Sequence, residues 1–239
     1  MLNSMELTGR TRSHLAELTD PRCTIHNEVV GPFLKLHAAA AKEGINLVPA
    51  SSFRDFERQK LIWNNKYNGE RAVYDGAGLK VDILKLSLEE RVELMLIWSA
   101  LPGASRHHWG TDLDIFDRAA VSIDYEPKLL ASEYAIGGPF SKLNKWLDRN
   151  LKKFGFFRPY GKASSRIHDK ELQIKNNWVG VNPEPWHISY SPIAQACLPL
   201  LTPKLLSDLI KTNEIQGSVY ILKNIEDIHT KFVMSINAP

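Results

Sequence analysis

The sequence has little cysteine and little net charge, and each shortage excludes a class of protein. Its 239 residues include two cysteines, Cys23 and Cys197, which stand far apart in the chain. They could pair with each other, but two thiols make neither a disulfide framework nor a zinc knuckle, and two separate free or buried thiols are expected. The net charge is +3 and no run of lysine and arginine is present, so we expect no nucleic-acid partner.

Long apolar runs are also missing. No stretch reaches the ~20 apolar residues that a membrane-spanning helix needs, so we expect no membrane span. The first twenty residues lack an apolar core between a basic start and a small-residue cleavage site, which argues against a signal peptide. As the sequence stands we expect a cytoplasmic protein, or a periplasmic or cell-wall protein if a leader was removed. The composition, 44% hydrophobic and 24% charged, is that of an ordinary globular chain.

One stretch, residues 105–114, has the sequence Ser-Arg-His-His-Trp-Gly-Thr-Asp-Leu-Asp. It places an imidazole at His107 and a carboxylate at Asp114, with Gly110 between them to allow a turn. The near-alternation of side chains in residues 112–116 predicts a strand after that turn. A neutral imidazole and a carboxylate oxygen both suit zinc, although such a pair alone occurs by chance in many chains.

A second stretch, residues 184–187, adds another imidazole at His187 and another carboxylate at Glu184. Two histidines and one aspartate make three ligands with one coordination position left open, which is typical of a catalytic zinc. Glu184 is then the spare carboxylate that can accept a proton from water at the metal. Because Pro185 pushes the residue before it toward extended conformations, we expect Glu184 on a loop and His187 on the strand that follows.

These stretches together resemble the LAS group of zinc peptidases, named after lysostaphin, the D-alanyl-D-alanine metallopeptidases and sonic hedgehog. The pattern that carries the resemblance is Ser105-x-His107-x-x-Gly110-x-x-x-Asp114 followed by Glu184-x-Trp186-His187. Its third element is present as residues 51–54, Ser-Ser-Phe-Arg, followed by Gln59. The resemblance covers roughly residues 30–192. Within the group, the sequence most resembles the VanY-like D-alanyl-D-alanine carboxypeptidases. One departure is Asp112, where the family usually has a small residue such as alanine.

The resemblance implies a zinc metallopeptidase that removes the C-terminal D-amino acid from a peptidoglycan stem peptide or precursor. It implies one Zn²⁺ per chain on His107, Asp114 and His187, with Glu184 as the general base. It also implies that Arg54 clamps the terminal carboxylate of the substrate with two parallel hydrogen bonds. The other residues that it implies for substrate binding are Ser51, Gln59, Ser105 and Trp186. Arg106 and His108 receive no role, and His108 is expected to be exposed or to lie behind the ligands.

Other activities of the same group stay open at this point. They are an L,D-carboxypeptidase, a D-Ala-D-Ala dipeptidase and a peptidoglycan endopeptidase. A protein of another class, a zinc-bearing binding module without turnover, is also possible within this fold group. Glu184 argues against such a module, because binding alone does not need a general base.

The predicted fold class is α+β, with a small, mainly antiparallel sheet that carries the zinc site and helices that flank it, as in hedgehog and the D,D-peptidases. We expect an N-terminal arm over residues 1–27, a peptidase domain over 28–200 and a C-terminal appendage over 201–239. Capping signals and apolar periodicity predict helices, and short apolar runs predict strands. The helices are expected at 32–42, 55–68, 87–100 and 139–154, the strands at 45–50, 112–116 and 187–190, loops at 69–85 and 117–138, a polar segment at 161–177, and a strand, a short helix and a tail at 217–239.

Overall fold

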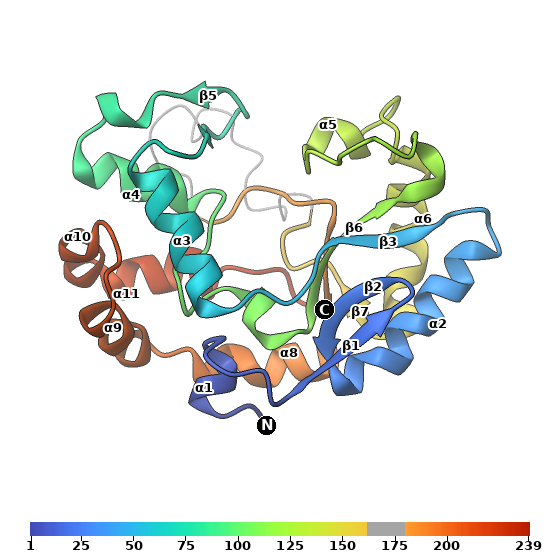
Figure 1. The fold of residues 1–239 in the computed structure, drawn as a ribbon, viewed down its shortest axis with the longest axis horizontal. Coiled ribbons are helices and arrows are strands. Elements are labelled where there is room, and N and C mark those ends of the chain that lie inside the picture. The colour runs from blue at the N-terminus through green and yellow to red at the C-terminus, as the bar shows by residue number, and fades with distance from the viewer. Residues whose placement is uncertain (162–179) are drawn as a thin grey trace.

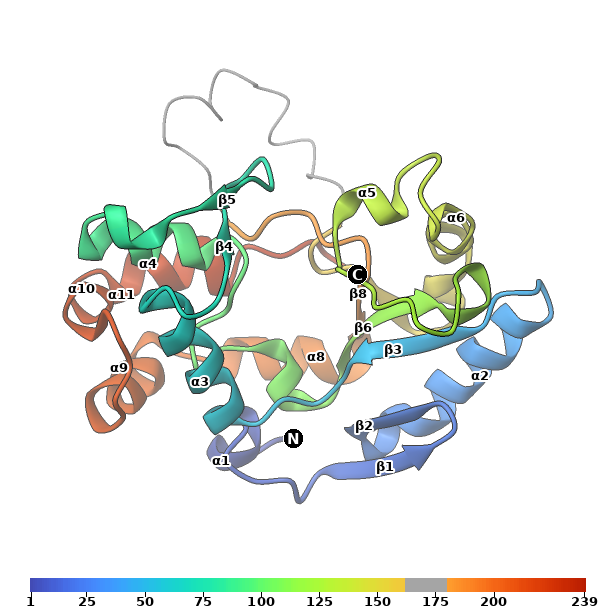
Figure 2. The same ribbon diagram turned by 45° about the horizontal axis from the view of Figure 1, so that its top comes forward.

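A four-stranded antiparallel sheet forms the centre of one half of the molecule, and helices build most of the other half (Figures 1 and 2). The computed structural model describes residues 1–161 and 180–239. The strand order is β3-β6-β8-β7, and every neighbouring pair is antiparallel. The four strands are β3 Leu47–Ser51, β6 Asp112–Asp117, β8 His187–Tyr190 and β7 Phe156–Phe157. The predicted α+β class and its small antiparallel sheet are confirmed.

Two hairpins and a set of helices complete the described part of the chain. The hairpins pair β1 Leu15–Thr19 with β2 Arg22–His26, and β4 Val73–Tyr74 with β5 Lys80–Val81. The helices are α1 Ser4–Leu7, α2 Val30–Ala41, α3 Phe56–Tyr67, α4 Leu88–Leu96, α5 Ala131–Tyr134, α6 Ser141–Asn150, α8 Ser191–Cys197, α9 Pro203–Thr212, α10 Ser218–Lys223 and α11 Ile225–Ile228. A 3₁₀ turn, η3 Arg106–Trp109, precedes β6.

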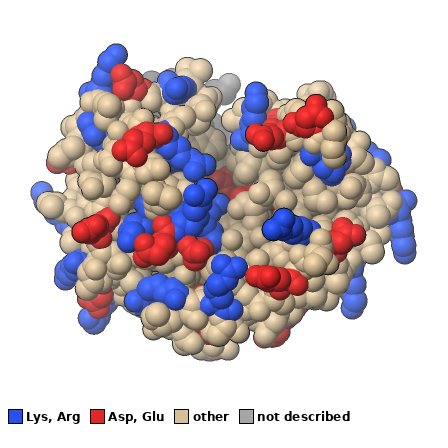
Figure 3. All heavy atoms as spheres, viewed as in Figure 1, with Lys and Arg blue, Asp and Glu red and all other residues tan. Residues whose placement is uncertain are grey.

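The buried apolar side chains form two clusters, one in each half. The helical core gathers side chains from α3, α4 and the C-terminal helices, among them Trp63, Leu96 and Leu206. The sheet core gathers side chains from the central sheet, α2 and α6, among them Ile115 and Trp146. Figure 3 shows that the surface is hollowed between the two halves. Residues from both halves can therefore line a site at the boundary between the two cores.

The signals that predicted the helices are present in the structure. Asp55 caps α3 because its Oδ1 accepts a hydrogen bond from the backbone N–H of Arg58 at 2.8 Å. Ser87 and Glu90 form the predicted capping box at the start of α4. Gly155 ends the helical segment before β7 with a φ of 79°, which glycine adopts without strain. The predicted helices near 32–42, 55–68 and 139–154 and the three predicted strands are confirmed.

Several boundaries and one element differ from the predictions. The helix expected over 87–100 ends at Leu96, and the loop expected over 69–85 contains the short hairpin β4–β5. The strand predicted in 217–239 is wrong, because α10 and α11 occupy that segment and bury Ile221 and Ile228 in the helical core. The polar segment predicted at 161–177 lies, apart from Gly161, outside the described residues.

The N-terminal residues form structure that the sequence analysis did not predict. The expected arm over 1–27 contains α1 and the hairpin β1–β2, and Ile25 is buried in the sheet core. The indole N–H of Trp109 donates to the carbonyl of Leu7 at 3.1 Å, which ties this segment to the turn before β6. The division into 1–27, 28–200 and 201–239 stays a prediction. In the described residues no single helix is long and apolar enough to cross a membrane. The bent pair Ser191–Leu200 and Pro203–Thr212 meets the criteria of length and composition only when its two helices are taken together.

Candidate metal centre

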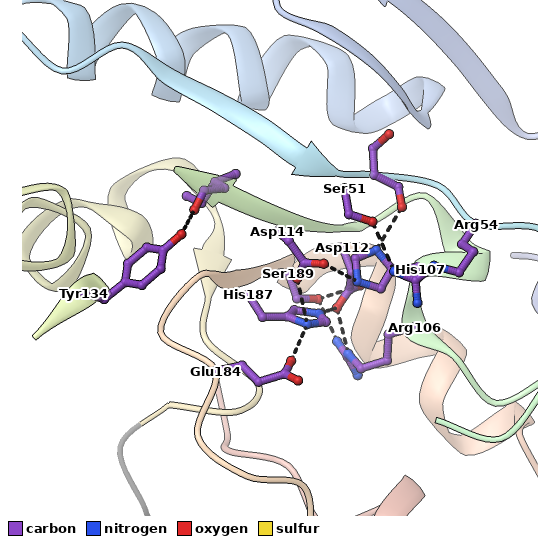
Figure 4. A network of polar contacts seen from close by, with 12 residues as sticks. Ser51, Arg54, Arg106, His107, Asp112, Asp114, Tyr134, Glu184, His187 and Ser189 are labelled. Carbon is purple, nitrogen blue, oxygen red and sulfur yellow. Dashed lines mark hydrogen bonds and ion pairs between the residues drawn. The ribbon is translucent and has the colours of Figure 1, made fainter. Parts of the chain in front are cut away.

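The predicted metal ligands meet where β6, β8 and the turn η3 come together (Figure 4). Asp114 lies on β6 directly opposite His187 on β8, and on its other side it pairs with Ser51 on β3. His107 enters from η3. One ligand atom from each of His107, Asp114 and His187 lies within 4.8 Å of the others, and all three residues are buried. The three side chains therefore form a cluster that is able to hold one metal ion.

The turn between η3 and β6 needs a glycine. Gly110 has a φ of 68°, a left-handed conformation, and its carbonyl accepts a hydrogen bond from the backbone N–H of His26 at 2.8 Å. A Cβ at this position would lie 2.6 Å from the backbone nitrogen of His26, so any side chain would push the β1–β2 hairpin away. The glycine of the motif thus fixes the path that delivers His107 and Asp114 to one place.

The hydrogen bonds of His107 indicate which of its nitrogens faces the metal. Its Nδ1 lies 2.9 Å from the backbone carbonyl of Ser52, an atom that can only accept, so Nδ1 carries the proton. Its Nε2 lies 3.3 Å from Oδ2 of Asp114. Nε2 is therefore the nitrogen that points into the cluster and is available to a metal.

His187 is contacted by carboxylates on both sides of its ring. Its Nε2 lies 2.9 Å from Oδ1 of Asp112, and its Nδ1 lies 2.9 Å from Oε2 of Glu184 and 3.5 Å from Oδ1 of Asp114. Burial opposes the charged ring, but the hydrogen bonds that the ring donates to Asp112 and Glu184 and the charge of Asp114 outweigh it and raise the pKa of His187 to about 10. A metal ion on Nδ1 has to displace a proton from this ring.

The donor set fits a zinc ion. Oδ1 of Asp114 is buried and has no hydrogen-bond partner among the described residues, although a buried carboxylate oxygen is costly to leave without one. It faces Nδ1 of His187, so a cation between the ligands would satisfy it. Two imidazole nitrogens and one carboxylate oxygen are ligands that zinc binds well. His107, Asp114 and His187 are therefore the residues that would hold the metal.

Glu184 lies at the edge of the cluster, on the loop that Pro185 was expected to impose. Its backbone N–H donates to the carbonyl of Tyr160 at 2.7 Å, which fixes the loop. Its carboxylate points toward His187 in Figure 4, with the side chain 13% exposed and so within reach of water. A carboxylate in this position can exchange a proton with a water molecule beside the ligands.

Arg54 forms a second group with two further predicted residues, Gln59 and Ser51, and Figure 4 shows Arg54 and Ser51 beside the metal cluster. Its Nη1 donates to Oε1 of Gln59 at 2.9 Å, and its Nη2 donates to Oγ of Ser51 at 3.1 Å. No carboxylate of the described residues lies within ion-pair distance of this guanidinium. Burial lowers the pKa of Arg54, and the charges of Asp114 and Glu184 oppose that effect. The structure thus brings together three of the five residues predicted to bind substrate.

The other two predicted substrate residues are buried in the walls. Ser105 is 2% exposed, and its carbonyl accepts the backbone N–H of His108 at 3.0 Å. Trp186 is 4% exposed and packs against the ring of Tyr134 at 5.7 Å. Trp186 thus has an aromatic packing partner and Ser105 is buried, and contact with substrate stays a prediction for each.

Sequence reasoning missed the role of His108. This residue is fully buried, with Nδ1 at 2.6 Å from the carbonyl of Arg54 and Nε2 at 3.1 Å from the backbone N–H of Gly103. Burial lowers its pKa to about 3, so the ring is neutral and donates from Nδ1. Gly9 leaves room for this ring, since a Cβ there would lie 2.4 Å from Nδ1. His108 therefore fixes the backbone of Arg54, and its spacing from His107 gave no signal of that.

Lys66 is a second cation that the sequence did not single out. Its Nζ lies 2.5 Å from Oγ of Ser99, and among the described residues no carboxylate pairs with it. Burial lowers the pKa of Lys66 to about 8, and the charges of Arg71 and Arg54 act in the same direction. Lys66 follows Gln59 by two turns of α3, which places the two side chains on one face of that helix. This helical spacing from Gln59 was the signal in the sequence that could have indicated Lys66 as a residue near the site.

The chain is similar to known proteins in its sequence. The family model described as VanY, D-alanyl-D-alanine carboxypeptidase, matches residues 22–193. An uncharacterized protein of Haemophilus influenzae is 48% identical over 98 residues, which make up 40% of this chain and 67% of that protein. A D-alanyl-D-alanine carboxypeptidase of Enterococcus faecalis is 28% identical over 168 residues, 70% of this chain and 48% of that protein. The chain thus spans about half the length of this named relative.

A comparison with solved structures gives a weaker similarity. The structure of VanYB in complex with D-alanine-D-alanine has a TM-score of 0.49 and 23% sequence identity to this chain. The match covers 84% of this chain and 89% of that one.

Proposed function

Because the chain belongs to the VanY family of D-alanyl-D-alanine carboxypeptidases, we propose that it is a zinc-dependent carboxypeptidase that acts on peptidoglycan stem peptides. The bond that it hydrolyses is the one before the C-terminal D-amino acid. The observation that carries the proposal is the arrangement in Figure 4, where the metal cluster lies between the carboxylate of Glu184 and the guanidinium of Arg54. A base and a carboxylate-binding group on two sides of a metal suit the removal of a terminal residue.

A zinc ion held by His107, Asp114 and His187 would supply Lewis acidity to the scissile carbonyl and to the attacking water. Glu184 accepts the proton of that water and later delivers it to the leaving amine, so one carboxylate serves both halves of the reaction. Its side chain is suited to this exchange because it is partly exposed, whereas the ligands are buried.

Arg54 selects a free C-terminus in this mechanism. Its contacts with Gln59 and Ser51 occupy two donors, and a guanidinium has five N–H donors, so three remain for a substrate carboxylate. Both contacts are with neutral groups, which orient the side chain without neutralising its charge. A partly buried cation of this kind favours an anion, and its planar fork matches the two oxygens of a carboxylate.

A panel of four synthetic substrates tests this function with the zinc-loaded protein. The panel contains a stem pentapeptide that ends in D-Ala-D-Ala, the same peptide with an amidated C-terminus, the tetrapeptide that lacks the last residue, and free D-Ala-D-Ala. Products are identified by mass spectrometry, and chelator-treated protein is the control. We expect the pentapeptide to lose one D-alanine and the other substrates to react more slowly.

Each other outcome replaces the proposal with a defined alternative. Preferred cleavage of the tetrapeptide identifies an L,D-carboxypeptidase, and preferred cleavage of free D-Ala-D-Ala identifies a dipeptidase. An internal cut that ignores amidation identifies an endopeptidase. A protein that binds zinc and the pentapeptide but cuts nothing is a binding module, and the position of Glu184 then needs another explanation.

A further inference from the structure

We propose that Asp112 is a positioning residue that holds the imidazole of His187 in the orientation and tautomer that metal binding requires. The proposal rests on the proposed function only through the assignment of His187 as a ligand. It concerns the position at which the resemblance departs from its pattern, since a small residue is usual there. Asp112 is not one of the three ligands, and it contacts Nε2 of His187, whereas Asp114 contacts Nδ1.

The carboxylate of Asp112 is completely buried and fully satisfied. Its Oδ1 accepts from Nε of Arg106 at 2.8 Å and from Nε2 of His187 at 2.9 Å. Its Oδ2 accepts from Oγ1 of Thr111 at 2.6 Å and from Oγ of Ser189 at 3.0 Å. A carboxylate has about four lone-pair sites, so each one is used. Such a carboxylate has little freedom to move, and neither does a ring that donates to it.

Asp112 and Asp114 lie on one face of β6 but have opposite surroundings. Asp112 has four donors, whereas Oδ1 of Asp114 has no hydrogen-bond partner among the described residues. The sheet register places Asp112 opposite Ser189 and Asp114 opposite His187, so the four polar side chains form two adjacent pairs. The protein itself therefore uses all the hydrogen-bonding capacity of Asp112, whereas Asp114 keeps an oxygen that can bind a cation.

The contact with Asp112 determines which nitrogen of His187 can bind the metal. An ionised carboxylate only accepts, so Nε2 keeps its proton, and Nδ1, which faces the cluster, is the nitrogen left to bind the metal once it has given up its own proton. A ligating imidazole whose other N–H binds a carboxylate has a fixed ring orientation and is a more basic ligand. His107 has a neutral backbone carbonyl in the same role, so His187 is the more strongly supported of the two rings.

Arg106 offsets the charge of the buried Asp112. Its guanidinium is itself buried, donates from Nη2 to Ser189 at 2.6 Å and lies over the ring of Trp109 at 4.7 Å. Either charge alone would be left without its partner in the interior, which is strongly destabilising. The alternative role of Asp112 is therefore purely structural, as half of an ion pair that joins η3 to the sheet. The experiment has to distinguish this role from an effect on metal binding.

The test compares Asp112→Asn with Ser189→Ala. Asparagine keeps the shape of Asp112 but removes its charge, whereas the alanine variant loses the hydrogen bonds to Asp112 and Arg106 and leaves the contact with His187 in place. Zinc affinity is measured by competition with a chromophoric chelator, and thermal unfolding of the metal-free protein is followed by circular dichroism. We expect Asp112→Asn to bind zinc about 10- to 100-fold more weakly, the usual effect of losing such a partner. Ser189→Ala keeps the affinity of the parent even where its Tm falls.

The double variant Arg106→Met, Asp112→Ala covers the case in which Asp112→Asn fails to fold, because it leaves no charge unpaired. We expect this variant to fold and to show the same weaker zinc binding. Parent-like affinity in a folded Asp112 variant would overturn the proposal, as would equal losses of affinity in Asp112→Asn and Ser189→Ala. His187→Ala gives the affinity expected without this ligand. No substrate is used, so a parent that binds zinc but cuts no peptide would refute the proposed function and leave this result intact.

Discussion

The two halves of the molecule offer opposite charges to the site between them. In the sheet half, β6 and β8 supply the carboxylates of Asp112 and Asp114 and the ring of His187. In the helical half, α3 and the segment before it supply two partly buried cations, Arg54 and Lys66, whose hydrogen-bond partners are all neutral. Figure 3 shows Lys and Arg side chains beside the hollow on the helical side and acidic atoms within it.

This difference indicates what each half is built to hold. Two strands and the turn η3 fix the metal ligands within 4.8 Å of one another, which suits an ion that tolerates little change in geometry. Cations in a weakly polar surrounding keep a strong field, which suits an anionic substrate that has to enter and leave. The sheet half therefore favours a cation and the helical half an anion, and three predictions test this contrast.

The largest effect is expected in the sheet half, from Glu184→Gln. Glutamine keeps the shape of the side chain but cannot take a proton, so turnover of the pentapeptide should fall about 10²- to 10⁴-fold. The metal content of the variant should equal that of the parent, because Glu184 is not among the three ligands. Glu126→Gln, at an exposed position, is the control and should be unchanged. Turnover close to that of the parent would remove Glu184 from the mechanism.

A smaller effect is expected in the helical half, from Arg54→Lys. A desolvated, charge-assisted pair contributes roughly 1.5–3 kcal/mol, so kcat/KM on a free-acid peptide should fall by about one to two powers of ten. Amidation of the peptide should lower kcat/KM in the parent and cost clearly less in the variant, because the partner is already impaired. Arg58→Lys, on the exposed face of α3, is the control. A parent that cuts free and amidated peptides equally well would show that Arg54 is no carboxylate clamp.

The smallest effect concerns Lys66 and depends on pH. Its folded pKa, about 8, is lower than its usual value of 10.5, so between these values the unfolded chain binds the extra proton. The contribution of Lys66 to stability therefore increases as pH rises from 8 toward 10.5, and below pH 8 the buried ammonium costs free energy. The difference in unfolding free energy between the parent and Lys66→Met should therefore shift in favour of the parent by on the order of 1–2 kcal/mol when the pH is raised from 7 to 9.5.

Chemical denaturation of both proteins at the two pH values measures this gain. Lys145→Met, an exposed lysine on α6, should follow the parent at both. If Lys66→Met and the parent change in parallel, Lys66 is charged and solvated across the whole range, and the contrast between the two halves then rests on Arg54 alone.

The metal ligands were predictable because their signal is local. Motif spacing located His107, Asp114 and His187, and Pro185 predicted the loop that carries Glu184. Helices with a capping residue, such as Asp55 at the start of α3, were also found from the sequence. In each case a few neighbouring residues determine the local conformation, so no knowledge of distant contacts was needed.

The remaining features depend on contacts between distant segments. The role of Asp112 requires the register between β6 and β8, and a slip of one residue would turn its side chain to the other face. The apolar run after Gly217 fits a strand or a helix equally well, and packing against the helical core decides for the helix. His108 braces Arg54 across 54 positions of sequence, which no spacing rule can predict.

Gly9 connects the substrate side of the site to residues that precede the matched family region. The matched region begins at residue 22, yet the ring of His108, which holds the carbonyl of Arg54, fits only because residue 9 has no side chain. The φ of 72° at Gly9 adds a second reason against replacement. A larger residue at position 9 would have to displace the ring of His108, the segment that carries Arg54 or the N-terminal segment itself. The N-terminal segment is therefore part of what holds the backbone of Arg54 in place.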